Sequence, residues 1–484
     1  MATLQERIRA ARDKSKANLP TWKREAFKPS KDFKIKNLPK QLYPYQLEGV
    51  EFLNQHNGNA ILGDDMGLGK TAQIIAYLQH NQDIRPALVL CKSALKLKWS
   101  IETFAFAERK VCNTAYILNG RKHKNIQEVL LKGDGMPSFI EHKKLPKTGI
   151  FIINYDIFEN WIEEIIKLKP MIIIIDEAQY VRSTKTKRWA AFCDIKEETG
   201  CKRFIPTTGT LLENRPMDIF NAINLVAPEM FPNYFTFGKR YCNGRKRAFG
   251  WDFTGKSNLK ELFTRLSSIM IRRHKKDVLK DLPPKTRTII PLEIDMKAYT
   301  AIEKSAEKLS QAKREMMLQA AAEGKLDAAM DWIEDFLSSG DKLVVFAFHK
   351  KIVNGIYEEF KEWAIKVDGA TSAKAKGEAE YIFQNDPKVK LLVGNLKSAG
   401  EGLTLTEAYA TATVELLDHS PSLHLQAEDR VLRIGQTAEG VFAYYFVAVG
   451  TIDEENIVEL ERRSKIASAV LDGKTNGQFE LKED

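Results

Sequence analysis

The feature that most constrains the fold is residues 59–80, where the aliphatic run NAIL leads into DDMGLGKT at 64–71 and then into an amphipathic stretch. A strand, a glycine loop and a helix in this order form the context of a phosphate-binding loop. Gly67 and Gly69 let the backbone approach an anion closely, and the helix N-terminus points its N–H groups at it. The sequence therefore predicts an α/β fold that binds a nucleotide.

The loop residues have separate expected roles. We expect Lys70 to reach the β- and γ-phosphates of ATP and the Thr71 hydroxyl to bind Mg²⁺. Asp64 stands five residues before Gly69, where the general pattern has glycine, so only the helicase variant of the pattern fits. The residues predicted to contact the nucleotide here are Asp64, Met66, Gly67, Leu68, Gly69, Lys70 and Thr71.

Two carboxylates, Asp176 and Glu177, follow the run MIIII about a hundred residues after the loop. A buried parallel strand delivers the residues at its end to the ligand edge of the sheet. We expect Asp176 to hold Mg²⁺ and Glu177 to orient or deprotonate the attacking water. An acidic pair alone is often merely solvated, but together with GKT it indicates ATP hydrolysis. Gln46, in LYPYQLEGV, is predicted to contact adenine, because an amide both donates and accepts hydrogen bonds.

Short aliphatic runs alternate with amphipathic stretches in two parts of the chain, which predicts two parallel sheets covered by helices. We expect a basic arm at 1–40, a first lobe at 41–225, a helical insertion without strands at 226–340, a second lobe at 341–450 and a C-terminal helix and tail at 451–484. The predicted strands are Asn59–Leu62, Ala87–Cys91, Gly149–Asn154, Met171–Ile175, Lys202–Ile205, Leu343–Phe346, Ala364–Val367, Lys390–Gly394, Ala412–Leu417 and Phe442–Val449.

Composition limits the class of protein. The net charge is +10, and residues 1–40 hold twelve Lys and Arg against four Asp and Glu, which favours an anionic partner, although a solvated terminus fits equally well. The five cysteines form no CxxC pair, so neither a disulfide framework nor a zinc site is indicated.

No aliphatic run is long enough for a membrane span and no secretory signal is visible. We expect a cytoplasmic protein of a prokaryote or phage-infected cell, or a nuclear one of a eukaryote.

Arg430 and Arg433 lie three residues apart in QAEDRVLRIGQ at 426–436. This spacing places both guanidinium groups on one face of a helical turn. From there they can stabilise the transition-state charge at a γ-phosphate. The alternative interpretation is a surface ion pair with Glu428 or Asp429.

Taken together, these motifs resemble those of the Swi/Snf family of superfamily 2 helicases. The matching blocks are YPYQ (43–46), DDMGLGKT (64–71), DEAQ (176–179), TGTLLENRP (208–216), IRRHKKDVLKDLPPK (271–285), LVVFAFHK (343–350), VDGATS (367–372), SAGEGLTL (398–405) and QAEDRVLRIGQT (426–437). The block at 271–285 separates this family from other superfamily 2 helicases. The sequence of residues 250–262, GWDFTGKSNLKEL, is most similar to that of the annealing-helicase branch of the family.

The resemblance implies two RecA-like lobes of the P-loop NTPase type and a monomeric translocase on double-stranded or branched DNA with DNA-stimulated ATPase activity. Fork regression, branch migration and strand annealing are the remodelling reactions it implies. It places Gly400, Glu401, Gly402 and Gln426 at the nucleotide, and Thr208 and Ser398 at DNA. Thr208, Gly209 and Thr210 would link the two sites. The departures are Asp65 for Glu, Lys92 and Leu211 for Pro, DHSP at 418–421 for an aromatic segment, and DEAQ for DEAH.

Basic side chains outside the ATP motifs are the predicted DNA contacts. Such residues would neutralise phosphates without reading sequence. Each run can also be plain solvated surface, and the run at 239–247 is favoured because it contains no acid. The predicted contacts are Lys185, Lys187, Arg188, Arg240, Arg245, Lys246, Arg247, Arg272 and Arg273.

Two other functions remain open. The first is an RNA helicase of the same superfamily, against which the block at 271–285 argues. The second is a nucleotide-gated DNA-binding protein with little turnover, against which Lys70, Glu177, Arg430 and Arg433 argue.

Overall fold

The computed structural model describes residues 27–132, 137–209, 215–231, 233–248, 250–305, 310–399, 402–417, 420–474, 476 and 478–479. Most of the predicted basic arm, and the predicted site residues Thr210, Gly400 and Glu401, therefore lie outside the described residues. The chain divides into two compact units, residues 1–278 with 469–473 and residues 279–468 with 474–484. It passes from one unit to the other three times.

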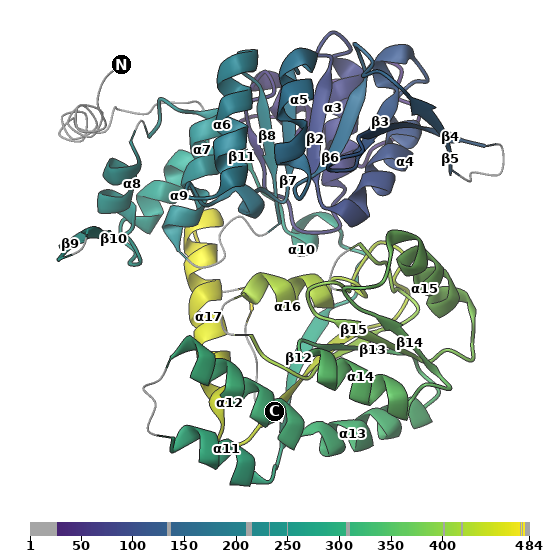
Figure 1. The fold of residues 1–484 in the computed structure, drawn as a ribbon, viewed down its shortest axis with the longest axis vertical. Helices are drawn as coiled ribbons and strands as arrows, with labels where there is room; N and C mark the ends of the chain where they lie inside the picture. The colour runs from purple at the N-terminus through teal and green to yellow at the C-terminus, as the bar shows by residue number, and fades with distance from the viewer. Residues whose placement is uncertain are drawn as a thin grey trace. The chain divides into compact units, whose positions relative to one another are not determined.

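The first unit is built on a nine-stranded sheet in the order β11-β1-β8-β7-β2-β6-β3-β4-β5 (Figure 1). The strands are β1 (Ile61–Leu62), β2 (Ala87–Cys91), β3 (Ala115–Asn119), β4 (Asn125–Leu131), β5 (Pro137–His142), β6 (Ile150–Asn154), β7 (Ile172–Asp176), β8 (Phe204–Thr207) and β11 (Met270–Ile271). All pairs from β11 to β3 are parallel, and β3, β4 and β5 continue the sheet as antiparallel hairpins.

The central strands of this sheet are continuous aliphatic runs because both of their faces are covered. Ile172 to Ile175 of β7 are fully buried, as are the residues of β2. The helices of the first unit are α2 (Pro44–Gln55), α3 (Lys70–His80), α4 (Lys96–Phe106), α5 (Ile162–Leu168), α6 (Lys187–Thr199), α7 (Phe220–Val226), α8 (Tyr234–Tyr241), α9 (Leu259–Leu266) and α10 (Lys275–Val278). Residues of α2, α3 and α4 share one hydrophobic core with β1, β2, β6 and β7.

The second unit is built on a six-stranded, wholly parallel sheet in the order β12-β17-β16-β13-β15-β14. The strands are β12 (Lys285–Leu292), β13 (Leu343–Ala347), β14 (Ala364–Val367), β15 (Leu391–Asn395), β16 (Ala410–Thr413) and β17 (Val441–Ala448). The helices are α11 (Met296–Glu303), α12 (Gln311–Gly324), α13 (Leu326–Ser338), α14 (Lys350–Glu359), α15 (Ala373–Asn385), α16 (Pro421–Glu428) and α17 (Ile452–Leu471). The fold class is thus α/β with two parallel-sheet lobes, as predicted.

All ten predicted strands are confirmed, with bounds shifted by one to four residues at most ends. The prediction that 226–340 lacks strands is wrong. β11 pairs with β1 of the first sheet, β12 pairs with β17 of the second, and β9 (Arg245–Arg247) forms a hairpin with β10 (Gly250–Asp252). The predicted insertion is therefore divided between the two units. Its helical stretch is real, since α11, α12 and α13 cover most of 296–338.

A buried ion-pair cluster ties β12 and β17 to α16 in the second unit. Lys285 Nζ and Arg287 Nε each lie 2.6 Å from the Glu428 carboxylate, and the Tyr445 hydroxyl donates to it at 2.6 Å. The Glu428 side chain is 2% exposed. Burial opposes ionisation, but the Arg287 and Lys285 charges hold the pKa of Glu428 well below its usual range.

We expect Glu428→Gln to lower the free energy of unfolding by about 3 kcal/mol at pH 7, because it leaves two buried cations poorly compensated. Since the folded-state pKa of Glu428 is depressed, its contribution is fully present above the ordinary carboxylate pKa and is lost progressively as pH falls from there through the folded-state pKa. Urea denaturation at pH 7 and about pH 3 measures this difference. An equal loss at both pH values would contradict the assignment.

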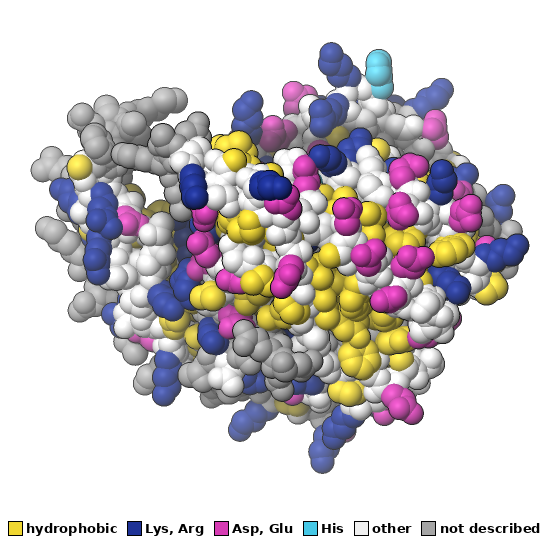
Figure 2. All heavy atoms as spheres, turned by 90° about the horizontal axis from the view of Figure 1, so that it is seen from below, with side chains coloured by type: hydrophobic (Ala, Val, Ile, Leu, Met, Phe, Trp, Pro, Cys, Tyr) yellow, Lys and Arg dark blue, Asp and Glu magenta, His cyan; other side chains and the backbone are white. Residues whose placement is uncertain are grey.

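Figure 2 shows one face of the molecule, on which apolar side chains gather in one area with acidic side chains beside it and Lys and Arg mainly towards its margin. Among the helices that the structure describes, each is too short or too polar to cross a lipid bilayer.

Candidate nucleotide site and nucleic-acid interface

The phosphate loop lies between β1 and α3, as predicted. Gly67 and Gly69 have φ values of +80° and +73°, in the left-handed region that favours glycine. A Cβ at Gly69 would collide with the Gln46 amide. Gly69 precedes α3 and offers no side chain to its first N–H groups. The loop thus presents an uncapped helix N-terminus, which suits an anion.

Lys70 is the first residue of α3 and folds back over its own loop. Its Nζ donates to the carbonyl oxygens of Asp64, at 2.7 Å, and Asp65, at 3.2 Å. A bound phosphate would replace these carbonyls as the partner of the ammonium group. The geometry therefore fits the predicted role of Lys70, with the lysine held near the loop by weak neutral acceptors.

Gln46 lies beside the loop, where it was predicted to contact adenine. It is 6% exposed. Its Nε2 donates to Leu68 O at 3.2 Å and its Oε1 accepts from Tyr43 N at 3.0 Å. In this arrangement Gln46 fixes α2 to the phosphate loop, and the adenine contact remains a proposal.

The side chains of Asp64 and Asp65 point into the protein and anchor the loop. Asp64 is fully buried and accepts from Arg273 Nη2 at 2.6 Å and from Gln73 Nε2 at 3.0 Å. Asp65 accepts from Lys275 N at 3.1 Å and lies 3.6 Å from Arg272 Nη2. The Asp64 carboxylate is thus occupied, which leaves its backbone for the predicted nucleotide contact.

Asp176 and Glu177 end β7 at the same edge of the sheet as the loop, with β8 between β7 and β1. Asp176 accepts from the Trp99 indole N–H and from the Thr207 hydroxyl, each at 2.9 Å. Burial raises the pKa of the Asp176 carboxyl, and the neighbouring Glu177 charge raises it further. A partly buried carboxylate whose donors here are neutral groups is the kind of ligand that a divalent cation stabilises.

Glu177 adopts a left-handed backbone conformation, with φ of +58°. Its carboxylate accepts from Gln179 Nε2 at 3.0 Å, and Gln179 Oε1 accepts from the Thr208 hydroxyl at 2.9 Å. Gln179, noted from the sequence only as a departure in DEAQ, therefore connects the predicted catalytic base with the predicted DNA-coupling threonine. Trp99 was missed altogether, because one tryptophan on a helix carries no sequence signal.

In the second unit, Arg430 and Arg433 follow α16 in successive turns. Arg430 is 3% exposed and donates to Gln426 O at 2.9 Å and Leu403 O at 3.2 Å. Arg433 is half-buried and donates to Asp429 O at 2.9 Å and to the Thr404 hydroxyl at 3.1 Å. Gln426 is buried beside them, and its Oε1 has no hydrogen-bond partner among the described residues.

Of the remaining predicted residues of this unit, the structure describes Ser398 and Gly402. Gly402 has a φ of +86°, a left-handed conformation. Ser398 follows β15 and its hydroxyl donates to Asn395 Oδ1 at 3.3 Å, while its carbonyl accepts from Lys376 Nζ at 2.8 Å. Ser398 thus follows the carboxyl end of β15, at the edge where ligands bind to parallel sheets.

The predicted DNA contacts fall into exposed and paired groups. Arg245, Lys246 and Arg247 are exposed along β9, and the β9–β10 hairpin stands away from the nine-stranded sheet (Figure 1). Lys239 Nζ lies 4.5 Å from the ring centroid of Trp251, which is 39% exposed on β10. A cationic strand with an exposed aromatic residue suits phosphate contact.

The other predicted contacts differ in their surroundings. Lys185 and Lys187 are exposed before and at the start of α6. Arg188 lies 3.7 Å from Asp156 and packs over Tyr155, and Arg240 is bonded to Glu261 at 2.9 Å. These two guanidinium groups already have acidic partners on the surface, and so does exposed Arg247, whose Nη2 lies 3.1 Å from Asp252.

Arg272 and Arg273 do not lie on the surface. Arg272 is 6% exposed and donates to Gly63 O at 2.7 Å and Gly209 O at 3.2 Å, while Arg273 is engaged with Asp64. Contact with DNA would require both buried ion pairs to break, at a cost of several kcal/mol each. We therefore remove Arg272 and Arg273 from the proposed DNA contacts and place them under the phosphate loop.

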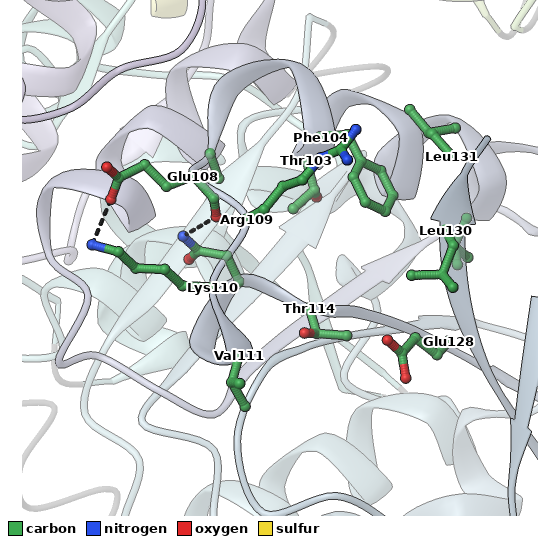
Figure 3. Close-up of a pocket in the computed structure, with 13 residues that line it drawn as sticks. Thr103, Phe104, Glu108, Arg109, Lys110, Val111, Thr114, Glu128, Leu130 and Leu131 are labelled. Atoms are coloured by element: carbon green, nitrogen blue, oxygen red, sulfur yellow. Dashed lines mark hydrogen bonds and ion pairs between the residues drawn. The ribbon is translucent and has the colours of Figure 1, made fainter. Parts of the chain in front are cut away.

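A separate pocket of about 280 Å³ lies between the end of α4, residues 108–114 and β4 (Figure 3). Lys110 Nζ lies 2.6 Å from Glu108 at its rim. It is lined by Thr103, Phe104, Ala107, Glu108, Arg109, Lys110, Val111, Asn113, Thr114, Glu128, Val129, Leu130 and Leu131. None of these is a predicted site residue, so this pocket is distinct from the nucleotide site.

Comparison with known families matches residues 45–338 to the SNF2-related domain. The chain is 32% identical over 434 residues to the SWI/SNF-related matrix-associated actin-dependent regulator of chromatin subfamily A-like protein 1 of Xenopus tropicalis, covering 86% of this chain and 43% of that protein. It is 30% identical over 468 residues to the DNA annealing helicase and endonuclease ZRANB3 of Homo sapiens, covering 92% and 41%. The chain thus spans less than half the length of these relatives.

Among solved structures, the Sulfolobus solfataricus SWI2/SNF2 ATPase core in complex with dsDNA is similar at a TM-score of 0.44 and 24% identity, covering 90% of this chain and 95% of that one. The Sulfolobus solfataricus SWI2/SNF2 ATPase core domain is similar at a TM-score of 0.43 and 23% identity, covering 91% of this chain and 94% of that one.

Proposed function

Because the chain belongs to the SNF2-related family of ATPases, we propose that it is a motor that uses ATP to move along double-stranded or branched DNA. The observation that carries the proposal is the Asp176–Glu177 pair, which ends β7 at the same sheet edge as the phosphate loop. We further propose that the remodelling reaction is fork regression, branch migration or strand annealing; the similarity to a human DNA annealing helicase and endonuclease supports the last of these.

In this proposal the first unit holds the nucleotide. The N-terminus of α3 and Lys70 bind the phosphates, and Thr71 and Asp176 are the candidate ligands of Mg²⁺. The cation would neutralise charge on the β- and γ-phosphates. Glu177 accepts a proton from the attacking water or orients it, and its bond to Gln179 fixes the carboxylate.

DNA contact is proposed for the exposed basic residues of the first unit, above all Arg245, Lys246 and Arg247 of β9, with Lys185 and Lys187. The hydrogen bonds from Glu177 through Gln179 to Thr208 are a candidate route by which DNA binding reaches the hydrolytic site. In the second unit, Arg433 is proposed to meet the γ-phosphate of ATP, and Ser398 is proposed to contact DNA. The residues proposed to face the nucleotide are Gly400, Glu401, Gly402 and Gln426.

The test is ATP hydrolysis at one fixed salt concentration with no nucleic acid, single-stranded DNA, duplex DNA, a model fork and duplex RNA. We expect at least tenfold stimulation by duplex or forked DNA. In Lys70→Ala we expect turnover to fall about 10²-fold or more, because the only lysine of the loop leaves the phosphates. Lys167→Ala, at an exposed side chain of α5, is the matched control and should behave as wild type.

Stimulation of ATP hydrolysis by RNA alone would indicate that the protein is an RNA helicase. Nucleotide binding without stimulation by any nucleic acid would favour a nucleotide-gated binding protein. Hydrolysis that is equally fast without nucleic acid would contradict the coupling of ATP turnover to movement.

A further inference from the structure

Residues that are distant in sequence hold the phosphate loop in place. One of them, Asp472, lies outside every motif considered above. Asp472 follows the last residue of α17 and is 4% exposed in its side chain. Residues 469–473 belong to the first unit, although α17 begins in the second.

Asp472 is bonded to two cationic groups that also hold the loop. Arg272 Nε donates to its carboxylate at 2.6 Å, and His274 Nε2 lies 3.1 Å from the same oxygen. On the other side, Arg272 Nη2 lies 3.6 Å from Asp65, and His274 Nδ1 lies 3.3 Å from it. The arginine and the histidine are thus held between two carboxylates, Asp65 of the loop and Asp472.

These contacts fix the part of the loop on which Lys70 rests. Arg272 also donates to Gly63 O, and Lys275 N donates to Asp65, so both residues that bracket Asp64 are tied to the segment 272–275. Asp65 lies five residues before Lys70 in the same loop, and its carbonyl accepts from Lys70 Nζ at 3.2 Å. A shift of Asp65 therefore displaces the loop from which Lys70 reaches the phosphates.

We propose that Asp472 is a positioning residue for the phosphate loop, which acts through Arg272 and His274 and keeps Asp65 and Lys70 in the arrangement that binds nucleotide. The inference rests on the nucleotide site proposed above. It adds a residue from the far end of the chain that neither the glycine loop nor the family motifs include.

The protonation of His274 follows from the same geometry. Its hydrogen bonds to Asp472 and Asp65 raise the pKa of His274 to about 9, against the opposing effect of burial. The charged groups that face the ring are Asp472 after α17, Asp65 in the loop and Arg272 beside it. Removing the Asp472 charge takes away the largest of these effects, so the pKa of His274 falls towards its ordinary value of about 6.5.

The experiment compares Asp472→Asn with wild type in full-length protein. The dissociation constant of a fluorescent ADP analogue with Mg²⁺ is measured at pH 6.5, 7.5 and 8.5, together with KM and kcat for ATP at saturating duplex DNA. We expect an approximately tenfold rise in Kd and KM at pH 7.5 with kcat within twofold, because the loop binds ground state and transition state alike. The affinity of the variant should weaken further as pH rises, whereas that of wild type stays level.

The controls separate this role from a general loss of stability. Glu459→Gln makes the same chemical change on α17, at a carboxylate that pairs with Arg462 and Arg463 of its own helix, and should leave Kd unchanged. Asp472→Glu keeps the charge on a side chain one methylene longer, and should recover about half of the lost affinity but not all of it. In the double variant Asp65→Asn with Asp472→Asn, we expect the two losses to be less than additive, because both act on one cluster.

A lower melting temperature with unchanged nucleotide affinity would overturn the proposal, as would a flat pH profile in Asp472→Asn. If Asp472→Asn does not fold, Asp472→Glu decides, since a positioning role predicts altered affinity in a folded protein. Unchanged ADP binding in Lys70→Ala would instead show that the proposed nucleotide site itself is wrong.

Discussion

The Glu177→Gln variant should bind ATP about as tightly as wild type and hydrolyse it roughly 10³-fold more slowly. The amide retains the shape of the side chain and its hydrogen bond to Gln179, which lies 3.0 Å from the carboxylate. It loses the capacity to accept a proton from water. Because Asp176 and Lys70 are untouched, binding of the nucleotide should survive.

Single-turnover hydrolysis and equilibrium binding of ATP measure the two effects separately. Glu164→Gln is a suitable control, because Glu164 lies on α5 in an exposed ion pair with Lys124. A hydrolysis rate in Glu177→Gln within tenfold of wild type would remove Glu177 from the proposed catalytic role.

The second large effect is expected at Arg433. Removing a guanidinium group that meets the γ-phosphate in the transition state costs about 10³-fold or more in kcat. The structure distinguishes Arg433 from Arg430, although the sequence treats them alike. Arg430 is buried and its guanidinium bonds to the carbonyls of Gln426 and Leu403, whereas Arg433 is half-buried beside the Thr404 hydroxyl.

We therefore expect Arg433→Ala to lose DNA-stimulated turnover about 10³-fold while its melting temperature stays within about 2 °C of wild type. Arg430→Ala should lower the melting temperature by several degrees, because buried carbonyls lose their donor. Arg462→Ala, at an exposed side chain of α17, is the matched control. Loss of activity in Arg433→Ala that merely parallels unfolding would count against a role at the phosphate.

The nucleotide edge was predictable from sequence because each of its parts is local. The backbone conformation of Gly67 and Gly69 can be predicted from the residues next to them. The burial of the strand before Asp176 can likewise be predicted from its four consecutive isoleucines. The comparisons confirm the family that these motifs indicated.

The basic runs were not predictable in the same way. Arg272 and Arg247 look alike in sequence, yet Arg272 is 6% exposed beside Asp65 and Arg247 is exposed on β9. The acidic residues that form ion pairs with Arg272 and Arg273, Asp472 and Asp64, lie some 200 residues away in the chain. Only the three-dimensional fold brings these partners together.

The strands between 226 and 340 were missed for two reasons. β11 has two residues and exists only through its pairing with β1. β12 contains Pro291, which argues against a strand in sequence, but β12 is at the edge of its sheet, where proline is tolerated.

The order in which the chain visits the two units limits how the protein can be divided. A fragment that ends at Val278 contains the phosphate loop, Asp176 and Glu177, yet it lacks residues 469–473 of its own unit. The complementary fragment carries those residues at its far end. Neither lobe is therefore obtained whole by truncation, and an isolated ATP-binding lobe needs its short C-terminal peptide to be grafted on or supplied in trans.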